Sequence, residues 1–326
     1  MQMQNETNEL FINKYQPQKI NEFLMEQDTL DLIHILIKMD KFNILFIGES
    51  GCGKTSMIHA IVREYYTNIS ERNIDNNILT ISSLKEQGIH YYRNELKIFC
   101  QTKSSIPNKK KMVIIDDIDM LNEQCQQIIR NYIDHYSNNV HFLASSYNIQ
   151  KVLESLQSRL MIVRLNPLSK ENMNFFLKKI QERENIILQP SAEEFLLKIV
   201  NYNMKTLINY MEKFKLLDVP LITLDITKQL STSVNFVIFE NYVQFIKNKE
   251  LDKAVKLLYT IYDKGYTVMD ILDCFFLFVK TTDCLKEEDK YQWIPLICKY
   301  ITIFHTIHEE ELELALFTNE SLKIFY

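Results

Sequence analysis

A lysine and a threonine end a short glycine-rich stretch that has the composition of a phosphate-binding loop. The chain contains five glycines in 326 residues, and Gly48, Gly51 and Gly53 all fall within the segment GESGCGKTS. Glycine permits positive φ angles and lets backbone amides approach anionic oxygens closely. The spacing matches the pattern G-x-x-x-x-G-K-[ST]. We therefore expect Lys54 to reach the β- and γ-phosphates of ATP and the Thr55 hydroxyl to bind Mg²⁺.

The segments on either side of this loop favour a nucleotide site over a chance turn. Residues 43–47 form a short apolar run typical of a buried parallel strand, and residues 56–63 have helical spacing of apolar residues. Amides at a helix N-terminus bind anions, assisted by the helix dipole. The same position tends to lower the pKa of a thiol, so we expect Cys52 to be reactive. The predicted nucleotide-binding residues of the loop are Gly48, Glu49, Ser50, Gly51, Cys52, Gly53, Lys54, Thr55 and Ser56.

Two adjacent acids follow a second apolar run. Residues 112–115 predict a buried strand, and Asp116 and Asp117 come directly after it. This is the Walker B arrangement, in which Asp116 would hold the Mg²⁺ and Asp117 would polarise the attacking water. Acids can also simply cap the end of a strand, but a pair of them beside a phosphate-binding loop favours the catalytic interpretation.

The elements that must position these residues alternate along the first half of the chain. Five short strands, at 43–47, 78–81, 112–115, 140–144 and 161–164, are separated by helical stretches. This pattern predicts an α/β fold: a parallel five-stranded sheet with helices on both faces. A small helical lid and an all-α C-terminal domain follow, with a capping box at Ser191–Glu194 and interruptions at Lys264–Gly265 and Pro295. The predicted domains are 1–165, 166–224 and 225–326.

Composition narrows the class of protein. The chain is 46% apolar and has a net charge of −5. It lacks the run of about 18 apolar residues that a membrane span needs, and its polar N-terminus lacks a signal-peptide core. The six cysteines form no C-x-x-C pair, which predicts reduced thiols in an intracellular compartment. Residues 225–326 carry 11 basic and 16 acidic side chains, so this part is a poor surface for DNA.

The order and spacing of the motifs resemble the small subunits of replication factor C, the AAA+ sliding-clamp loader. The resemblance runs from about Phe11 to the C-terminus and includes FNILFIGESGCGKTS, GIHYYRNELKIF and DDIDMLNEQCQQIIRNYID. It implies an ATPase that helps open a ring clamp and load it onto primer–template DNA during replication. It also implies a hetero-oligomeric ring of five clamp-loader subunits, a clamp of the PCNA type and no membrane. The implied location is the nucleus in a eukaryotic cell, or the replication compartment of the host for a virus.

The same resemblance implies roles for residues outside the loop. Tyr15 and Pro17, in KYQP, match the segment that lies against the adenine. Arg159, at the end of ESLQSR, matches an arginine finger that enters the ATP site of the neighbouring subunit. Asn148 and Lys205 fall near the two sensor positions of the family. The DNA-facing side of the ring implies Arg93, Lys97 and Arg130 as DNA contacts, whereas KKK at 109–111 suits a solvated loop.

Several positions depart from the family pattern and keep alternatives open. Asp117 replaces a glutamate, and Lys205 replaces an arginine. The first sensor aligns without gaps to Tyr147, one residue before Asn148. These changes leave the prediction of ATP binding intact but weaken the prediction of fast hydrolysis. A scaffold subunit that only holds nucleotide therefore remains an alternative. Another AAA+ replication or recombination ATPase is a second alternative, although an initiator usually adds a basic winged-helix domain. A small-molecule P-loop kinase would need no finger in trans.

Overall fold

The computed structural model describes residues 10–40, 42–67, 69, 74–82, 88–217, 219–230, 236–282, 284–304 and 310–325. It comprises two compact units. The first contains Met1–Phe176 and Tyr202–Asn209, and the second contains Leu177–Asn201 and Tyr210–Tyr326. The three domains predicted from the sequence have other boundaries and stay a prediction.

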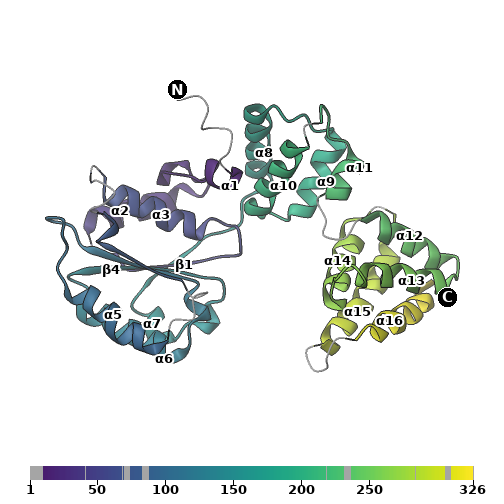
Figure 1. The fold of residues 1–326 in the computed structure, drawn as a ribbon. Coiled ribbons are helices and arrows are strands. Elements are labelled where there is room, and N and C mark those ends of the chain that lie inside the picture. The colour runs from purple at the N-terminus through teal and green to yellow at the C-terminus, as the bar shows by residue number, and fades with distance from the viewer. Residues whose placement is uncertain are drawn as a thin grey trace. The chain divides into compact units, whose positions relative to one another are not determined.

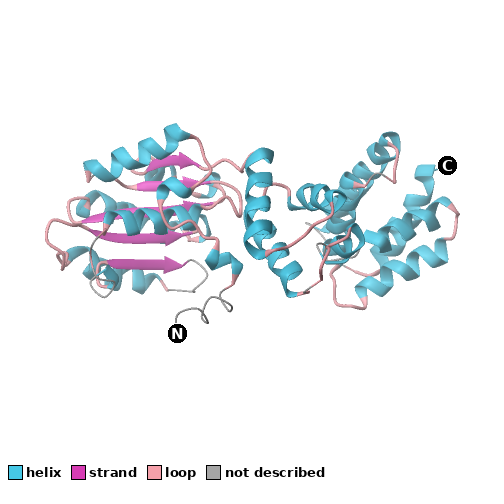
Figure 2. Cartoon of the chain, turned by 90° about the horizontal axis from the view of Figure 1, so that it is seen from above, coloured by secondary structure: helices cyan, strands magenta, loops and turns pink. Residues whose placement is uncertain are grey.

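The first unit is built on a parallel sheet of five strands in the order β2-β3-β4-β1-β5. Figure 2 shows the arrowheads of this sheet pointing the same way. The strands fall on the apolar runs that the sequence predicted, and the central strands β3, β4 and β1 are almost wholly buried because helices cover both faces of the sheet. The strands are β1 Ile44–Ile47, β2 Ile78–Ser82, β3 Lys111–Asp116, β4 Val140–Ser146 and β5 Met161–Arg164.

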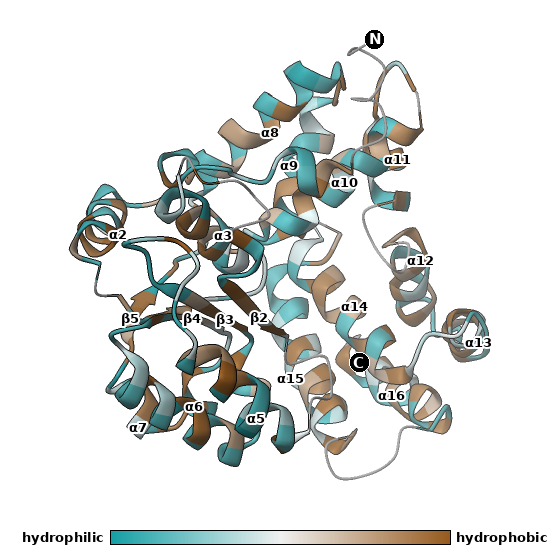
Figure 3. Ribbon diagram, turned by 60° about the vertical axis from the view of Figure 1, so that its left-hand side comes forward, coloured by the Kyte–Doolittle hydropathy of each residue, from teal (hydrophilic) through white to brown (hydrophobic). Residues whose placement is uncertain are grey.

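Helices cover both faces of this sheet (Figure 1). α2 (Gln27–Met39) and α3 (Lys54–Tyr65) lie on one face, where Phe46 and Ile114 enter their shared core. α5 (Ile89–Gln101), α6 (Glu123–Tyr136) and α7 (Glu154–Gln157) lie on the other, where Leu45 and Ile115 are buried. Figure 3 shows strands β2, β3 and β4 in the brown of hydrophobic residues. The predicted α/β class is confirmed. Shorter elements are α1 Phe11–Lys14, η1 Ile20–Glu22, η2 Ile118–Met120 and η3 Ile149–Lys151.

The rest of the described chain is helical. The core of the second unit is rich in aromatic rings: Trp293 is fully buried and lies edge-on to Phe275, with their ring centroids 5.0 Å apart. Phe275 and Phe278 therefore belong to the core. The helices are α8 Lys170–Glu184, α9 Pro190–Val200, α10 Met204–Leu216, α11 Leu224–Leu230, α12 Phe236–Lys247, α13 Leu251–Tyr262, α14 Val268–Thr281, α15 Glu287–Phe304, α16 Leu312–Leu322 and η4 Lys323–Phe325.

Two local expectations about these helices were wrong. α15 continues through Pro295, because Trp293 before it and Ile297 after it are both buried and hold the two halves of the helix to one core. α9 begins at Pro190, and the expected capping box at Ser191–Glu194 is absent. Proline suits the first position of a helix, since its missing N–H would have no partner there. Within the described residues, no helix is both long and apolar enough to cross a membrane.

Candidate nucleotide-binding site

The glycines of the loop after β1 occupy positions that a side chain could not share. Gly51 has a φ angle of 78°, in the left-handed region, and a Cβ atom there would collide with the side-chain amide of Asn203. A Cβ atom on Gly48 would lie 2.5 Å from the carbonyl oxygen of Leu165. Glycine is therefore needed at Gly51 because of the backbone conformation and at Gly48 because of close packing.

Lys54 is the first residue of α3, and its side chain folds back over the loop. Its Nζ donates hydrogen bonds of 2.8 Å to the Gly48 carbonyl oxygen and 2.9 Å to that of Glu49. The residue is only 9% exposed. The ammonium group is thus held beside the amides at the N-terminus of α3, where a phosphate would bind. Ser50 lies in the same loop, just before Gly51.

The two residues predicted to bind magnesium are in direct contact. The Thr55 hydroxyl donates a hydrogen bond of 3.1 Å to Oδ1 of Asp116, which ends β3. The Ser145 hydroxyl, from the neighbouring strand β4, donates to the same oxygen at 2.5 Å. Mg²⁺ prefers oxygen ligands and is commonly held by one carboxylate together with substrate phosphates. A hydroxyl and a carboxylate beside a phosphate-binding loop fit that preference.

Asp117 adopts an unusual backbone conformation beside this pair. Its φ angle is 52°, which is uncommon for a residue with a side chain and frequent at functional sites. Its backbone N–H donates to the Ser145 hydroxyl at 2.9 Å. Burial, followed by the charges of Asp116 and Asp119, raises the pKa of the Asp117 carboxyl. A carboxylate with a raised pKa is a stronger base at neutral pH.

The Cys52 thiol does not have the lowered pKa expected from the sequence. Cys52 is half-buried, and burial raises its pKa above the ordinary value for a thiol. The positive charge of Lys54 and nearby backbone amides act in the opposite direction but are outweighed. The expectation of a reactive thiol was therefore wrong, because an ionised sulfur would lose more hydration than the helix N-terminus returns.

The N-terminal segment predicted to lie against adenine approaches the start of α3. Gln16, between Tyr15 and Pro17, donates a side-chain hydrogen bond of 3.3 Å to the Ser56 hydroxyl. Tyr15 is 6% exposed, and its ring meets the edge of Phe176 at a centroid distance of 6.1 Å. Pro17 is half-buried. The segment is therefore packed onto the same unit as the loop.

The two sensor candidates differ in how they are held. The Asn148 side-chain oxygen accepts a hydrogen bond of 2.9 Å from the Gln150 amide and caps η3. Its backbone N–H donates to Asp119 at 2.9 Å. Tyr147, directly after β4, is 63% exposed. Lys205 is exposed in the first turn of α10, two residues after Asn203.

Arg159 lies at the opposite edge of the sheet from the loop. Met161, which begins β5, pairs with Ile44 at the start of β1, whereas Gly48 follows the end of β1. The four intervening residues span roughly 13 Å at about 3.3 Å per residue. The Arg159 guanidinium is held there by Asp134, near the end of α6.

The candidate DNA contacts lie on two adjacent helices. Arg93 and Lys97 are exposed on α5. Arg130 lies on α6, and one of its terminal nitrogens is 3.8 Å from the Asp134 carboxylate. α5 and α6 pack against each other on one face of the sheet (Figure 1), and the Tyr132 hydroxyl of α6 donates to the Arg93 carbonyl oxygen at 3.3 Å. All three basic residues therefore belong to one helical layer.

The lysines at 109–111, where β3 begins, do not form the solvated loop that the sequence suggested. Lys111 is only 5% exposed, and its Nζ donates a hydrogen bond of 2.5 Å to the Thr102 hydroxyl. The same ammonium lies 4.4 Å from the centre of the Phe99 ring. Lys110 donates to the Asp40 carbonyl oxygen at 2.8 Å. These side chains are held by the protein because the amino edge of the sheet supplies acceptors for them.

Sequence reasoning missed two residues that shape the site. Ser145 bonds both Asp116 and the Asp117 backbone, and the only sequence signal for it is a pair of serines that ends a buried strand. Asn203 lies against Gly51 and also accepts a hydrogen bond of 3.2 Å from the Thr206 amide. Its distance from the loop in the sequence hides this contact.

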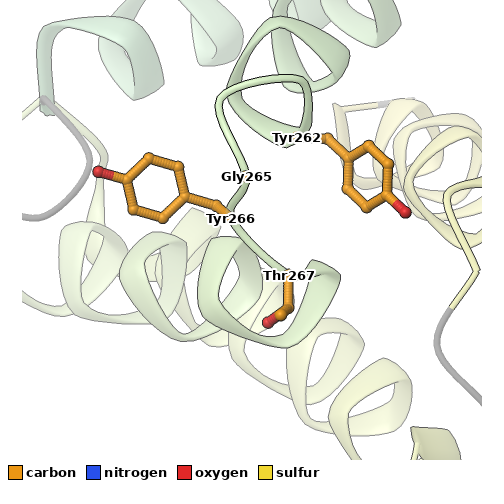
Figure 4. Close-up of a pocket in the computed structure, with 4 residues that line it drawn as sticks. All are labelled: Tyr262, Gly265, Tyr266 and Thr267. Atoms are coloured by element: carbon orange, nitrogen blue, oxygen red, sulfur yellow. The ribbon is translucent and has the colours of Figure 1, made fainter.

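A separate pocket of about 440 Å³ lies in the second unit, where α13 leads into α14. It is lined by Tyr262, Gly265, Tyr266 and Thr267, and Figure 4 shows the two tyrosine rings pointing to opposite sides of the connecting turn. None of the four lining side chains is charged, so the pocket is poorly suited to phosphate.

Comparisons with known proteins agree with this geometry. Residues 44–168 match the family model described as ATPase family associated with various cellular activities (AAA). Residues 237–301 match the Replication factor C C-terminal domain. Replication factor C subunit 2 of Arabidopsis thaliana is 26% identical over 292 residues, covering 85% of this chain and 82% of that protein. Replication factor C subunit 4 of Saccharomyces cerevisiae is 26% identical over 290 residues, covering 88% and 87%.

A solved structure supports the fold. The DNA polymerase III gamma subunit-related protein from Thermotoga maritima is similar with a TM-score of 0.55, at 13% identity over 91% of this chain and 99% of that one. The phosphate-binding loop and the aspartates after β3 both lie in the part of the chain that matches the AAA model. The chain therefore combines an AAA ATPase domain with a replication factor C C-terminal domain, and over most of its length it is similar to replication factor C subunits.

Proposed function

We propose that this chain is an ATP-binding and ATP-hydrolysing subunit of a clamp loader, which opens a ring clamp of the PCNA type and loads it onto primer–template DNA. The observation that carries the proposal is the contact between Thr55 and Asp116 beside the loop that holds Lys54. This arrangement suits Mg²⁺ and the phosphates of ATP. Similarity to replication factor C subunits supplies the link to clamp loading.

The residues of the site would divide the work of phosphoryl transfer. Lys54 and the loop amides, with Ser50 and Ser56 nearby, would bind the phosphates. Thr55 and Asp116 would hold Mg²⁺, which neutralises phosphate charge when bound. Asp117, with its raised pKa, would accept a hydrogen bond from the attacking water and orient it.

The remaining candidate residues would contact a neighbouring subunit, the DNA, or other parts of the nucleotide. Arg159, at the amino edge of the sheet, would serve the ATP site of a neighbouring subunit in a hetero-oligomeric ring of five. Arg93, Lys97 and Arg130 would face the DNA backbone, where contacts to phosphate give affinity without sequence preference. Tyr15 and Pro17 would contact the adenine, and Asn148 and Lys205 would approach the γ-phosphate. The location would be the nucleus in a eukaryotic cell, or the replication compartment of the host cell for a virus.

ATP turnover by the reconstituted assembly tests this proposal. ATP hydrolysis should rise when clamp and primed DNA are both added. Lys54→Ala should lower the ATP affinity of this subunit and reduce clamp loading by ~10²-fold, the scale of losing one key charge contact in a transition state. Unchanged nucleotide affinity and clamp loading in this variant would refute the site.

A scaffold role is the second candidate, favoured by one observation. The Asn148 side-chain oxygen is used as a helix cap, and Tyr147 is exposed at the position where the family has its first sensor. A subunit of this kind would bind ATP for assembly only. Single-turnover hydrolysis measured with every other subunit disabled at its phosphate-binding loop separates the two roles, since the scaffold would then show none.

A further inference from the structure

The guanidinium of Arg159 is held by hydrogen bonds to three residues of its own chain. Its Nε donates hydrogen bonds of 2.7 and 2.8 Å to the two carboxylate oxygens of Asp134. One terminal nitrogen, Nη1, donates at 2.7 Å to the Ser155 carbonyl oxygen and at 3.1 Å to the Ser158 hydroxyl. Within the described part of the chain, the other terminal nitrogen, Nη2, makes no hydrogen bond. The bonds thus hold the planar group through Nε and Nη1 and leave Nη2 for another acceptor.

Asp134 lies in an unfavourable place for a carboxylate. It is two residues from the end of α6, where the helix dipole concentrates partial negative charge. The Asp134 and Arg159 side chains are 39% and 29% exposed, and ion pairs with this exposure contribute little to folding stability. A contribution to folding stability therefore explains poorly why an acid is placed here. A role in orienting Arg159 explains it better, because Asp134 on α6 fixes the long, flexible side chain of an arginine outside that helix.

We propose that Asp134 is a positioning residue for the arginine finger. It aligns the guanidinium of Arg159 so that Nη2 points toward the γ-phosphate bound by the neighbouring subunit. The inference rests on the proposed role of Arg159 in trans. Catalysis by a positioned charge is sensitive to small displacements, since a shift of about 1 Å can cost on the order of 10²-fold in rate. Asp134 itself touches neither nucleotide nor water in this mechanism.

The test measures the kcat and KM of ATP hydrolysis at the neighbouring subunit's site, in the assembly purified with its partner subunits. Asp134→Ala should lower that kcat by about 10-fold while KM for ATP and the melting temperature of the chain stay unchanged. Asp134→Glu keeps the charge and should restore part of the rate. Asp134→Asn keeps the shape and an acceptor, and should fall between Ala and Glu. Glu64→Gln, which removes the charge of a carboxylate that lies 3.0 Å from the His34 ring, is the control and should change nothing.

A double-mutant cycle separates positioning from a structural role. In an Arg159→Ala background, Asp134→Ala should cause no further loss of kcat, because there is no finger left to align. An equal loss in both backgrounds, or a wild-type rate for Asp134→Ala beside an impaired Arg159→Ala, overturns the positioning role and leaves the finger standing. A wild-type rate for Arg159→Ala overturns the finger and this inference together.

Discussion

The Thr55 hydroxyl donates a hydrogen bond to the Asp116 carboxylate at 3.1 Å, joining the first turn of α3 to the end of β3. The two residues are 61 positions apart in the sequence. The parallel sheet brings them together, because the carboxyl ends of its strands share one edge and ligands bind outside that edge. This contact brings the two candidate magnesium ligands together beside the loop that holds Lys54.

Thr55→Val should uncouple nucleotide binding from magnesium. The substitution preserves the shape of the side chain but removes the hydroxyl, so Mg²⁺ should no longer increase the affinity for ATP. Titration of fluorescent ATP with Mg²⁺ and with EDTA checks this. Thr67→Val, just beyond α3, is the control: its hydroxyl bonds only the backbone of that helix, and magnesium dependence should remain. Normal magnesium dependence in Thr55→Val would contradict the assignment.

Gly51→Ala should abolish ATP binding without unfolding the chain. The positive φ angle costs an alanine ~1–2 kcal/mol, and its Cβ would collide with Asn203. The loop must therefore rearrange. Gly88→Ala is a matched control, since no atom lies within 4 Å of a Cβ there. Circular dichroism should show both variants folded, and calorimetry should show ATP binding by Gly88→Ala alone. Full affinity in Gly51→Ala would mean that the loop tolerates another conformation.

Much of this site could be predicted from the sequence because the signals are local. Apolar runs predicted the five strands, and the spacing of Gly48, Gly53 and Lys54 predicted the loop. The contacts of Asn203 with Gly51 and of Asp134 with Arg159 could not be predicted, because each joins segments that meet only after folding. Pro295 shows a second limit. Its local preference breaks a helix, but burial of its neighbours in the core decides the outcome.

The pH profile of hydrolysis should show the raised pKa of Asp117. A carboxyl with a raised pKa takes up its proton at a higher pH than an ordinary aspartate, so kcat/KM, which reports the free enzyme, should start to fall at a higher pH as the solution is acidified. Asp117→Asn should remove this acid limb together with most of the rate. Asp117→Glu should preserve the limb and extend the carboxylate toward the water. A limb that persists in Asp117→Asn would belong to another group.

Alkylation of Cys52 should be slow at neutral pH. Its pKa is raised by burial, so the reactive thiolate forms at a higher pH than in an ordinary thiol, and the rate should keep rising as the solution becomes more alkaline. The exposed Cys284 and Cys298 provide internal comparisons. Mass spectrometry of each peptide after iodoacetamide treatment gives the rates, and bound ATP should protect Cys52 alone. Faster labelling of Cys52 than of the exposed thiols would contradict the burial argument.

Arg159→Ala should leave ATP binding by this subunit nearly intact while it slows hydrolysis at an adjacent subunit. The reason is geometric: Arg159 precedes β5 at the amino edge of the sheet, whereas Gly48 follows β1 at the carboxyl edge. Arg159→Lys should rescue only in part, because an ammonium cannot bond Asp134 and a phosphate with the fixed geometry of a guanidinium. The measurement uses mixed assemblies in which one neighbour at a time has a disabled phosphate-binding loop. If Arg159→Ala costs the same activity whichever neighbour is disabled, or if it lowers the melting temperature sharply, Arg159 is a structural residue and the scaffold role gains support.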